Sequence, residues 1–182
     1  AKTSDSARRT LRPCIGTNDC INRTVGEGLP FACTVNPGLA AAEHKPLPPV
    51  ASPRRLLIVG GGPAGMQLAV TARERGHAVT LWERDPALGG QIRLAAKLPG
   101  NGEFLEFVGF LERRIAELGV VLELGREATA ADIIEGGFDV VALATGATPR
   151  RPEIAGIDSP AVCDMSQLLS GAVPVGERVA II

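Results

Sequence analysis

The chain has 182 residues, of which 45% are apolar and 21% are charged, and its formal net charge at pH 7 is −1. This length holds one ordinary domain plus an appendage, and the composition is that of a globular protein that folds in water. The near-neutral charge gives no electrostatic reason to expect a nucleic acid or an acidic membrane as a partner. No apolar run approaches the roughly 18 residues of a membrane helix, and no signal peptide is visible, so we expect a cytoplasmic protein.

The first part of the chain carries three of its four cysteines. Residues 11–38 show neither helical nor strand periodicity and are rich in turn residues, so they bury little apolar surface and need an external tie to become ordered. Cys14, Cys20 and Cys33 are spaced C-x5-C-x12-C, with Thr17 midway between the first two. Thiolates at such a density point to a metal site that would supply the tie.

Two other interpretations of these cysteines stay open. Three thiolates together with His44 have the right ligand number for zinc, although the spacing is unusual. Three inert thiols in a packed loop would need no metal. The fourth cysteine, Cys163, stands in an apolar context far downstream, and we expect it to be a buried core thiol rather than a missing ligand.

A proline-rich connector separates the cysteine segment from the rest. Residues 44–53 hold four prolines and predict a stiff, extended linker, with a domain boundary near Ala51. A strand over about Arg55–Gly60, a helix over about Pro63–Arg75 and a second strand over Ala78–Glu83 follow. We expect one domain over residues 51–176.

The turn after the first predicted strand, Gly60-Gly61-Gly62-Pro63-Ala64-Gly65, fits a dinucleotide-binding fingerprint. Gly60 permits a tight turn, Gly62 lets the backbone approach a pyrophosphate, and Gly65 lets the helix lie close to the strand. The helix start offers unpaired N–H groups and a positive dipole end to the phosphates. Glu83, at the end of the second strand, is placed to accept hydrogen bonds from an adenosine ribose and would repel the 2′-phosphate of NADP.

Further elements alternate in the same manner. We expect a helix over Glu103–Leu118, a strand over Val120–Leu124, a short helix over Thr129–Glu135 capped by Thr129, and a fully buried strand over Phe138–Ala144. This alternation predicts an α/β fold with a doubly wound, Rossmann-like parallel sheet, preceded by an irregular cysteine-rich segment.

The phrases RPCIGTNDCINR and CTVNPGLAAAEH, followed by the glycine fingerprint, resemble the iron–sulfur flavoenzymes of the trimethylamine dehydrogenase and 2,4-dienoyl-CoA reductase family. That family joins an old-yellow-enzyme-like FMN barrel to a four-cysteine [4Fe–4S] segment and two dinucleotide-binding domains. The resemblance implies cluster ligands at Cys14, Cys20 and Cys33, with Thr17 standing where the second ligand is expected. A threonine hydroxyl is too weak an acid to replace a thiolate easily. Three outcomes follow: a cubane with one iron bound by water or another group, a [3Fe–4S] cluster, or no cluster.

The resemblance also extends the nucleotide site. The pattern E-R-x-x-x-x-G-G-Q from Glu83 to Gln91 is similar to that of FAD-binding disulfide-reductase-like domains, and it favours FAD or ADP over NAD. In the family, the strand that ends in Ala144-Thr145-Gly146 delivers its backbone to the nucleotide or flavin, and a backbone contact to adenine falls near Ala128. The predicted cofactor-binding residues are Gly60, Gly62, Pro63, Ala64, Gly65, Glu83, Arg84, Gly90, Gln91, Ala128, Ala144, Thr145 and Gly146.

The last residues, ERVAII at 177–182, repeat the start of the first strand, RRLLIVG at 54–60. We therefore expect residues 177–182 to begin a second, NAD(P)-type domain, and the chain to be a fragment of a longer flavoenzyme whose FMN barrel acts on a small organic substrate. No nucleophile–base pair appears, so the cofactors would carry the chemistry. Two functions stay open: a module that relays electrons between the flavin barrel, a cluster and the nucleotide domain, or a redox-silent ADP-binding module braced by the cysteine segment.

Overall fold

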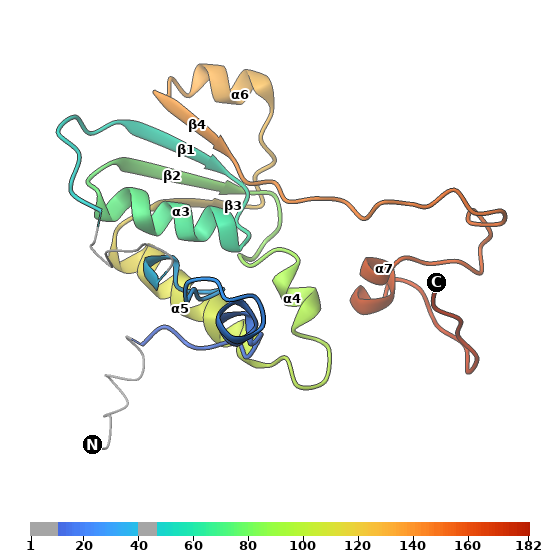
Figure 1. Cartoon of the computed structure of the whole chain (residues 1–182). Helices are drawn as coiled ribbons and strands as arrows, with labels where there is room; N and C mark the ends of the chain where they lie inside the picture. The colour runs from blue at the N-terminus through green and yellow to red at the C-terminus, as the bar shows by residue number, and fades with distance from the viewer. Residues whose placement is uncertain (1–10, 40–46) are drawn as a thin grey trace. The chain divides into compact units, whose positions relative to one another are not determined.

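The structure is a computed structural model that describes residues 11–39 and 47–182. It divides into two compact units, the first ending at Thr145 and the second running from Gly146 to Ile182. The first unit contains a four-stranded, all-parallel sheet in the order β3-β2-β1-β4 (Figure 1). Its elements along the chain are β1 (Arg55–Val59), α3 (Pro63–Glu74), β2 (Ala78–Glu83), α4 (Ile92–Ala95), α5 (Glu103–Glu117), β3 (Val121–Leu124), α6 (Ala130–Glu135) and β4 (Val140–Leu143).

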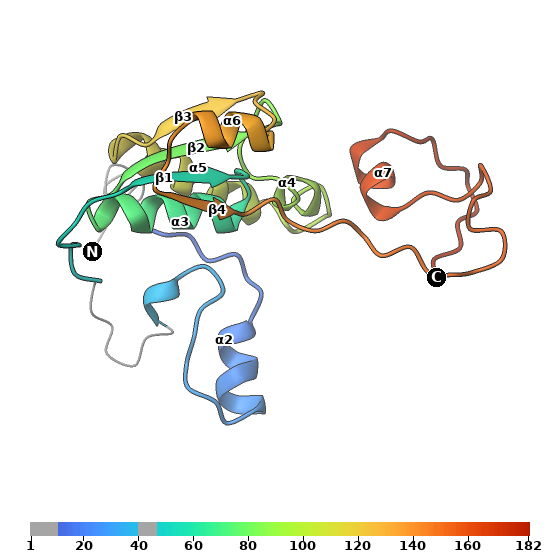
Figure 2. The same ribbon diagram turned by 90° about the horizontal axis from the view of Figure 1, so that it is seen from above.

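The helices lie on both faces of this sheet. Helices α3 and α5 cover one face, and α6 lies on the other, as the two views agree (Figures 1 and 2). The predicted α/β, Rossmann-like fold is therefore confirmed. Since all four strands are parallel, their carboxyl ends meet at one edge of the sheet, where open α/β folds bind ligands.

The core forms between the sheet and the helices α3 and α5. Helix α3 begins with Pro63 at its first position, where the missing N–H costs nothing, and the chain turns after it at Gly76 with φ +97°. Helix α5 is amphipathic, as its spacing predicts. The buried residues that α3 and α5 contribute are Gly65, Met66, Ala69, Val70, Ala72, Phe107, Val108, Phe110, Leu111 and Ile115.

The strand β4 differs from its prediction because it lies at the edge of the sheet. We expected a fully buried strand, but Leu143 is 73% exposed. Residues 177–182 form no strand within the described residues, and their assignment to the start of a second domain stays a prediction. A strand needs a neighbour for its backbone N–H and C=O groups, and no described strand pairs with this stretch.

The cysteine segment, residues 11–39, is more regular than its turn-rich composition predicts. It contains the short helix α2 (Asp19–Ile21), which continues into the π-helical turn η1 (Asn22–Gly26), and the 3₁₀ turn η2 (Pro37–Leu39). Val35 is buried in the core of the first unit, and Ile15 and Cys33 pack against that core. The segment therefore already has a protein tie to the nucleotide-binding fold.

The second unit, residues 146–182, contains the short helix α7 (Met165–Ser170), which begins with a capping box between Asp164 and Gln167. Cys163 is half-buried here, so its expected burial in a core is not found. The predicted limits of the domains, at residues 50 and 176, stay predictions. Across residues 11–39 and 47–182, none of the helices combines the length and the apolar character that crossing a membrane requires.

Candidate functional site: the glycine turn and the cysteine segment

The turn between β1 and α3 is packed so closely that two of its glycines admit no side chain. A Cβ atom on Gly60 would lie 2.3 Å from the carbonyl oxygen of Ala144, and Gly60 has φ +109°. A Cβ on Gly65 would lie 1.9 Å from the carbonyl oxygen of Gly60. Since real Cβ atoms never approach a backbone oxygen this closely, Gly60 and Gly65 fit the roles of tight turn and close helix–strand packing that the motif assigns to them.

Glu83 fixes the middle of the same turn. The side chain is 7% exposed, and its two oxygens accept hydrogen bonds from the backbone N–H groups of Gly61 (2.5 Å) and Asp85 (2.8 Å). A carboxylate has about four acceptor sites on its two oxygens, so these bonds leave acceptor capacity for a ribose hydroxyl. Gly61 is also closely packed, because a Cβ atom there would lie 2.4 Å from Leu88 Cδ2.

Gly62, in contrast, faces open space. A Cβ on Gly62 would meet no atom within 4 Å, and the residue precedes the first turn of α3, where Pro63 and Ala64 stand. Gly90 lies beside it, because a Cβ on Gly90 would lie 3.4 Å from the Cα of Gly62. The open side of Gly62, flanked by a helix start and a second glycine, is where backbone amides can approach an anionic group closely.

The remaining predicted cofactor residues are less tightly constrained than the glycines of the turn. Ala144, whose N–H donates to Val59 O (2.7 Å), is packed against the core, and Ala128 is half-buried. Arg84 and Thr145 are exposed. Gln91 stands directly before α4, and Gly146 begins the second unit.

The three cysteines of the segment do not converge. Within residues 11–39 and 47–182, no three Cys, His, Asp or Glu side chains lie close enough together to hold a metal ion. The hydroxyl groups of Thr17 and Thr34 form a hydrogen bond of 2.8 Å, so the residue at the expected second ligand position has a protein partner. In this arrangement the side chains do not fit a four-thiolate cluster, and the cluster stays a prediction. The zinc alternative depends on His44, which lies outside the described residues.

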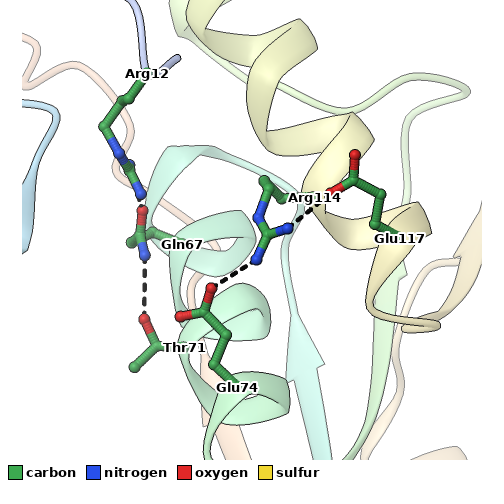
Figure 3. Close-up of polar contacts among 6 residues, drawn as sticks. All are labelled: Arg12, Gln67, Thr71, Glu74, Arg114 and Glu117. Atoms are coloured by element: carbon green, nitrogen blue, oxygen red, sulfur yellow. Dashed lines mark hydrogen bonds and ion pairs between the residues drawn. The ribbon is translucent and has the colours of Figure 1, made fainter. Parts of the chain in front are cut away.

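Arg12 connects the cysteine segment to α3 (Figure 3). Its Nη1 donates to Val35 O and to Gln67 Oε1, each at 2.7 Å, and Gln67 in turn donates to Thr71 Oγ1 (3.1 Å). The guanidinium carbon also lies 4.8 Å from the centre of the Phe110 ring. Partial burial lowers the pKa of Arg12, which nevertheless keeps its charge at every physiological pH.

A groove of about 390 Å³ brings the two predicted sites side by side. Cys33 and Thr34 of the segment form one part of its lining, and Pro63 and Ala64 of α3 form another. The predicted metal ligand Cys33 thus shares a surface with the first turn of the helix that follows the glycine fingerprint.

Sequence reasoning missed several residues of the site. Gly61 occupies a variable position of the fingerprint, and only its place in a run of three glycines distinguishes it. Arg12 stands two residues before Cys14, with no spacing that indicates its partner on α3. Trp82 and Arg126 were missed as well, because their contact joins parts of the chain that are distant in sequence.

Comparisons with known proteins bear on this geometry. Residues 54–182 match the family model described as "Pyridine nucleotide-disulphide oxidoreductase". The chain is 38% identical over 182 residues to an N,N-dimethylglycine/sarcosine dehydrogenase of Chromohalobacter salexigens and 35% identical over 176 residues to a metal reductase of Desulforamulus reducens. Each match covers 94% of this chain and 26% of the relative.

A solved structure of a 2-naphthoyl-CoA reductase in complex with 2-naphthoyl-CoA matches with a TM-score of 0.88 and 34% identity, over 94% of this chain and 26% of that chain. The chain thus spans about a quarter of the length of these proteins. The resemblance to the trimethylamine dehydrogenase and 2,4-dienoyl-CoA reductase group is confirmed. The chain belongs to the pyridine nucleotide-disulphide oxidoreductase family, among the flavin-dependent oxidoreductases that these relatives represent.

Proposed function

We propose that this chain binds the ADP part of FAD, or ADP itself, at the carboxyl edge of its parallel sheet, as part of a flavin-dependent oxidoreductase. The observation that carries the proposal is the bond from the Gly61 N–H to the buried carboxylate of Glu83. It joins the ends of β1 and β2 into one rigid surface, with the open side of Gly62 next to it. Little has to be ordered on binding, so little affinity is lost to reorganisation.

Each part of the ligand finds a matching group. The pyrophosphate would lie against Gly62 and the start of α3, where the helix dipole favours negative charge. The adenosine ribose would donate a hydroxyl to Glu83, and Gly90 would leave room for the backbone to pass beside the phosphates. A 2′-phosphate would face the Glu83 carboxylate, so NADP is disfavoured at this site.

Calorimetric titration of the full chain with ADP tests the proposal. ADP should bind, and 2′-phospho-ADP should bind at least about tenfold more weakly because of charge repulsion at Glu83. The Glu83→Gln variant should narrow that difference, whereas Arg151→Ala, in the other unit, should leave both affinities unchanged. Absence of ADP binding to the wild-type chain contradicts the proposal.

We infer the partners and chemistry of the whole protein from its resemblance to the family. FMN in a barrel, a second NAD(P)-type domain and a small organic substrate are the expected complements of this chain, and the flavin bound here would accept or pass on electrons. This chain's own residues hold and orient the nucleotide. An absorption spectrum of the purified protein, with the bands near 370 and 450 nm that are roughly typical of flavin, distinguishes FAD from ADP.

For the cysteine segment we propose a bracing role beside the nucleotide site. Arg12 and Val35 tie the segment to α3 and to the core. The hydrogen bond between the hydroxyl groups of Thr17 and Thr34 joins two distant parts of the segment, and Thr17 stands where the resemblance to the family places a thiolate ligand.

Electron relay through an iron–sulfur cluster is the second candidate. The C-x5-C-x12-C spacing favours it, as does the N–H of Gly16, which donates to Cys14 Sγ at 3.4 Å in the manner that steadies a thiolate. Iron and sulfide analysis of anaerobically purified protein separates the two candidates. Iron-free protein with intact ADP binding supports the bracing role, and the Thr17→Cys variant should then gain iron binding. Stoichiometric iron in the wild-type protein supports electron relay through a cluster.

A further inference from the structure

Trp82 is the only tryptophan of the chain, and two charged side chains enclose it at the carboxyl end of β2. The guanidinium carbon of Arg126 lies 3.6 Å from the centre of the Trp82 ring. The Trp82 Nε1 donates to Glu123 Oε1 (3.1 Å), and Glu123 also pairs with Arg126. Since Trp82 and Glu123 are direct neighbours in the ladder between β2 and β3, the three side chains form one cluster on one face of the sheet.

The backbone beside this cluster is tied to the nucleotide site. The N–H of Arg126 donates to Glu83 O (2.9 Å), and the N–H of Gly125 donates to Asp85 O (3.1 Å). Gly125 has φ +68°, a conformation that lets the chain turn sharply as soon as β3 ends. The stretch from Gly125 to Ala128 therefore starts next to Glu83 and Asp85, at the edge where the parallel strands end.

The contacts of Arg126 are more specific than those of an ordinary surface arginine. An exposed ion pair by itself contributes little to stability. A planar guanidinium stacked on an indole, however, fixes the direction of its own side chain and of the backbone that carries it. Arg126 stands between the end of β3 and the start of α6, where Thr129 caps the helix and fixes the far end of the same stretch. Both ends of the stretch are thus held in place before any ligand binds.

We propose that Arg126 is a positioning residue of the nucleotide site, which holds residues 125–128 beside Glu83 so that their backbone can contact the adenine ring. The inference rests on the proposed ADP binding and deepens it. The side chain of Arg126 contacts Trp82 and Glu123, and through them it acts on the adenosine end of the site, while the glycine turn acts on the pyrophosphate.

The test compares two probes, ADP and inorganic pyrophosphate, in calorimetric titrations of the full chain. Arg126→Ala should weaken ADP binding roughly tenfold, the scale of one lost stacking and positioning contact, and should change pyrophosphate binding less than about twofold. Arg126→Lys keeps the charge and loses the planar stack, so its ADP affinity should fall between those of the wild type and of Arg126→Ala. Arg151→Ala removes another arginine with an ion pair, to Asp158 in the second unit, and is the matched control.

Each outcome decides the inference. Equal loss of ADP and pyrophosphate binding in Arg126→Ala overturns it, because Arg126 would then support the fold in general. Unchanged ADP binding in Arg126→Ala overturns it as well and leaves the proposed function standing. No ADP binding by the wild-type chain overturns both proposals. Loss of ADP binding alone, with partial recovery in Arg126→Lys, supports the positioning role.

Discussion

The glycine turn at residues 60–65 and the cysteine segment at residues 11–39 belong to the same compact unit, yet different forces hold them in place. The turn is fixed chiefly by backbone packed against backbone, at separations that leave no space for a Cβ atom at Gly60 or Gly65, with the Glu83 carboxylate bonded to Gly61 in between. The segment is fixed by side chains, chiefly the two hydrogen bonds of Arg12 and the buried Val35. Substitutions should therefore disrupt the turn through steric conflict and the segment through the loss of single contacts.

The largest effect should come from Gly65→Ala. The new methyl group would lie 1.9 Å from Gly60 O, so β1 and α3 would have to separate. Overpacking against a rigid backbone should lower the free energy of unfolding by about 3 kcal/mol or more. Chemical denaturation followed by the fluorescence of Trp82 measures the loss.

Gly62→Ala is the matched control within the same turn. Its backbone, at φ −71° and ψ 176°, accepts any residue, and a Cβ there meets nothing within 4 Å. The free energy of unfolding should change by less than about 0.5 kcal/mol, while ADP affinity should fall, because the methyl group would stand between the backbone and the pyrophosphate. Equal stability losses in both variants would contradict the steric account of the turn.

Arg12→Ala should have a smaller and local effect. The variant loses two hydrogen bonds and a stacking contact with Phe110, together about 2 kcal/mol of local stability. Amide hydrogen exchange should accelerate in residues 11–39 and stay unchanged in β1 and β2, since the sheet does not depend on Arg12. Acceleration throughout the first unit would mean that Arg12 stabilises the sheet as well as the segment, and would contradict a local bracing role.

The contrast between the two regions also explains what the sequence could predict. The second strand, Ala78–Glu83, and the helix capped by Thr129 are found as expected, because apolar periodicity and capping residues act over a few neighbours. The glycine fingerprint could be recognised in the sequence for the same reason, because its pattern lies within a short stretch of backbone. Local patterns decide these features, and the sequence displays local patterns directly.

The features that sequence reasoning missed depend on distant partners. The exposure of β4 follows from its place at the edge of the sheet, which no pattern within Val140–Leu143 reveals. The bond between Arg12 and Gln67 spans 55 positions. The contact between Trp82 and Arg126 joins the end of β2 to the loop after β3, with α4 and α5 between them in the chain. The cysteine spacing suggested a metal, which stays a prediction, and it gave no indication of the hydrogen bonds by which Arg12 ties the segment to α3.

Arg114→Ala should change stability less than Arg12→Ala does, although both arginines bind α3 (Figure 3). Arg114 pairs with Glu74 of α3 (2.8 Å) and with Glu117 (2.7 Å), and these bonds raise its pKa, with the bond to Glu74 as the largest cause. The two glutamates are about half exposed, so solvent screens both pairs. The free energy of unfolding should fall by less than about 1 kcal/mol, and 0.5 M salt should remove most of the difference from the wild type. A loss equal to that of Arg12→Ala would contradict the distinction between partly buried and exposed contacts.

The smallest effect should appear on acidification, at the cluster of Trp82, Glu123 and Arg126. The hydrogen bond from Arg126 is the main reason why the pKa of Glu123 lies below its ordinary value of 4.5. A carboxylate whose pKa is lowered by folding stabilises the folded state above its unfolded pKa, and this contribution disappears as the pH falls through the lowered pKa. The side chains of Glu123 and Arg126 are each 38% exposed, so the contribution should be only a few tenths of a kcal/mol.

The emission of Trp82 detects this titration without unfolding, because protonation of Glu123 weakens its bonds to the indole and to Arg126. We expect a transition in the emission of the folded protein below pH 4.5, present in the wild type and absent in Glu123→Gln. Asp132 needs its own control, because its pKa is also lowered, chiefly by the Thr129 hydroxyl, and it interacts with Arg126. The transition should persist in Asp132→Asn. A transition that survives in Glu123→Gln and disappears in Asp132→Asn would show that the emission reports the titration of Asp132, in the cap of α6. It would contradict the expectation that Trp82 responds to the protonation of Glu123.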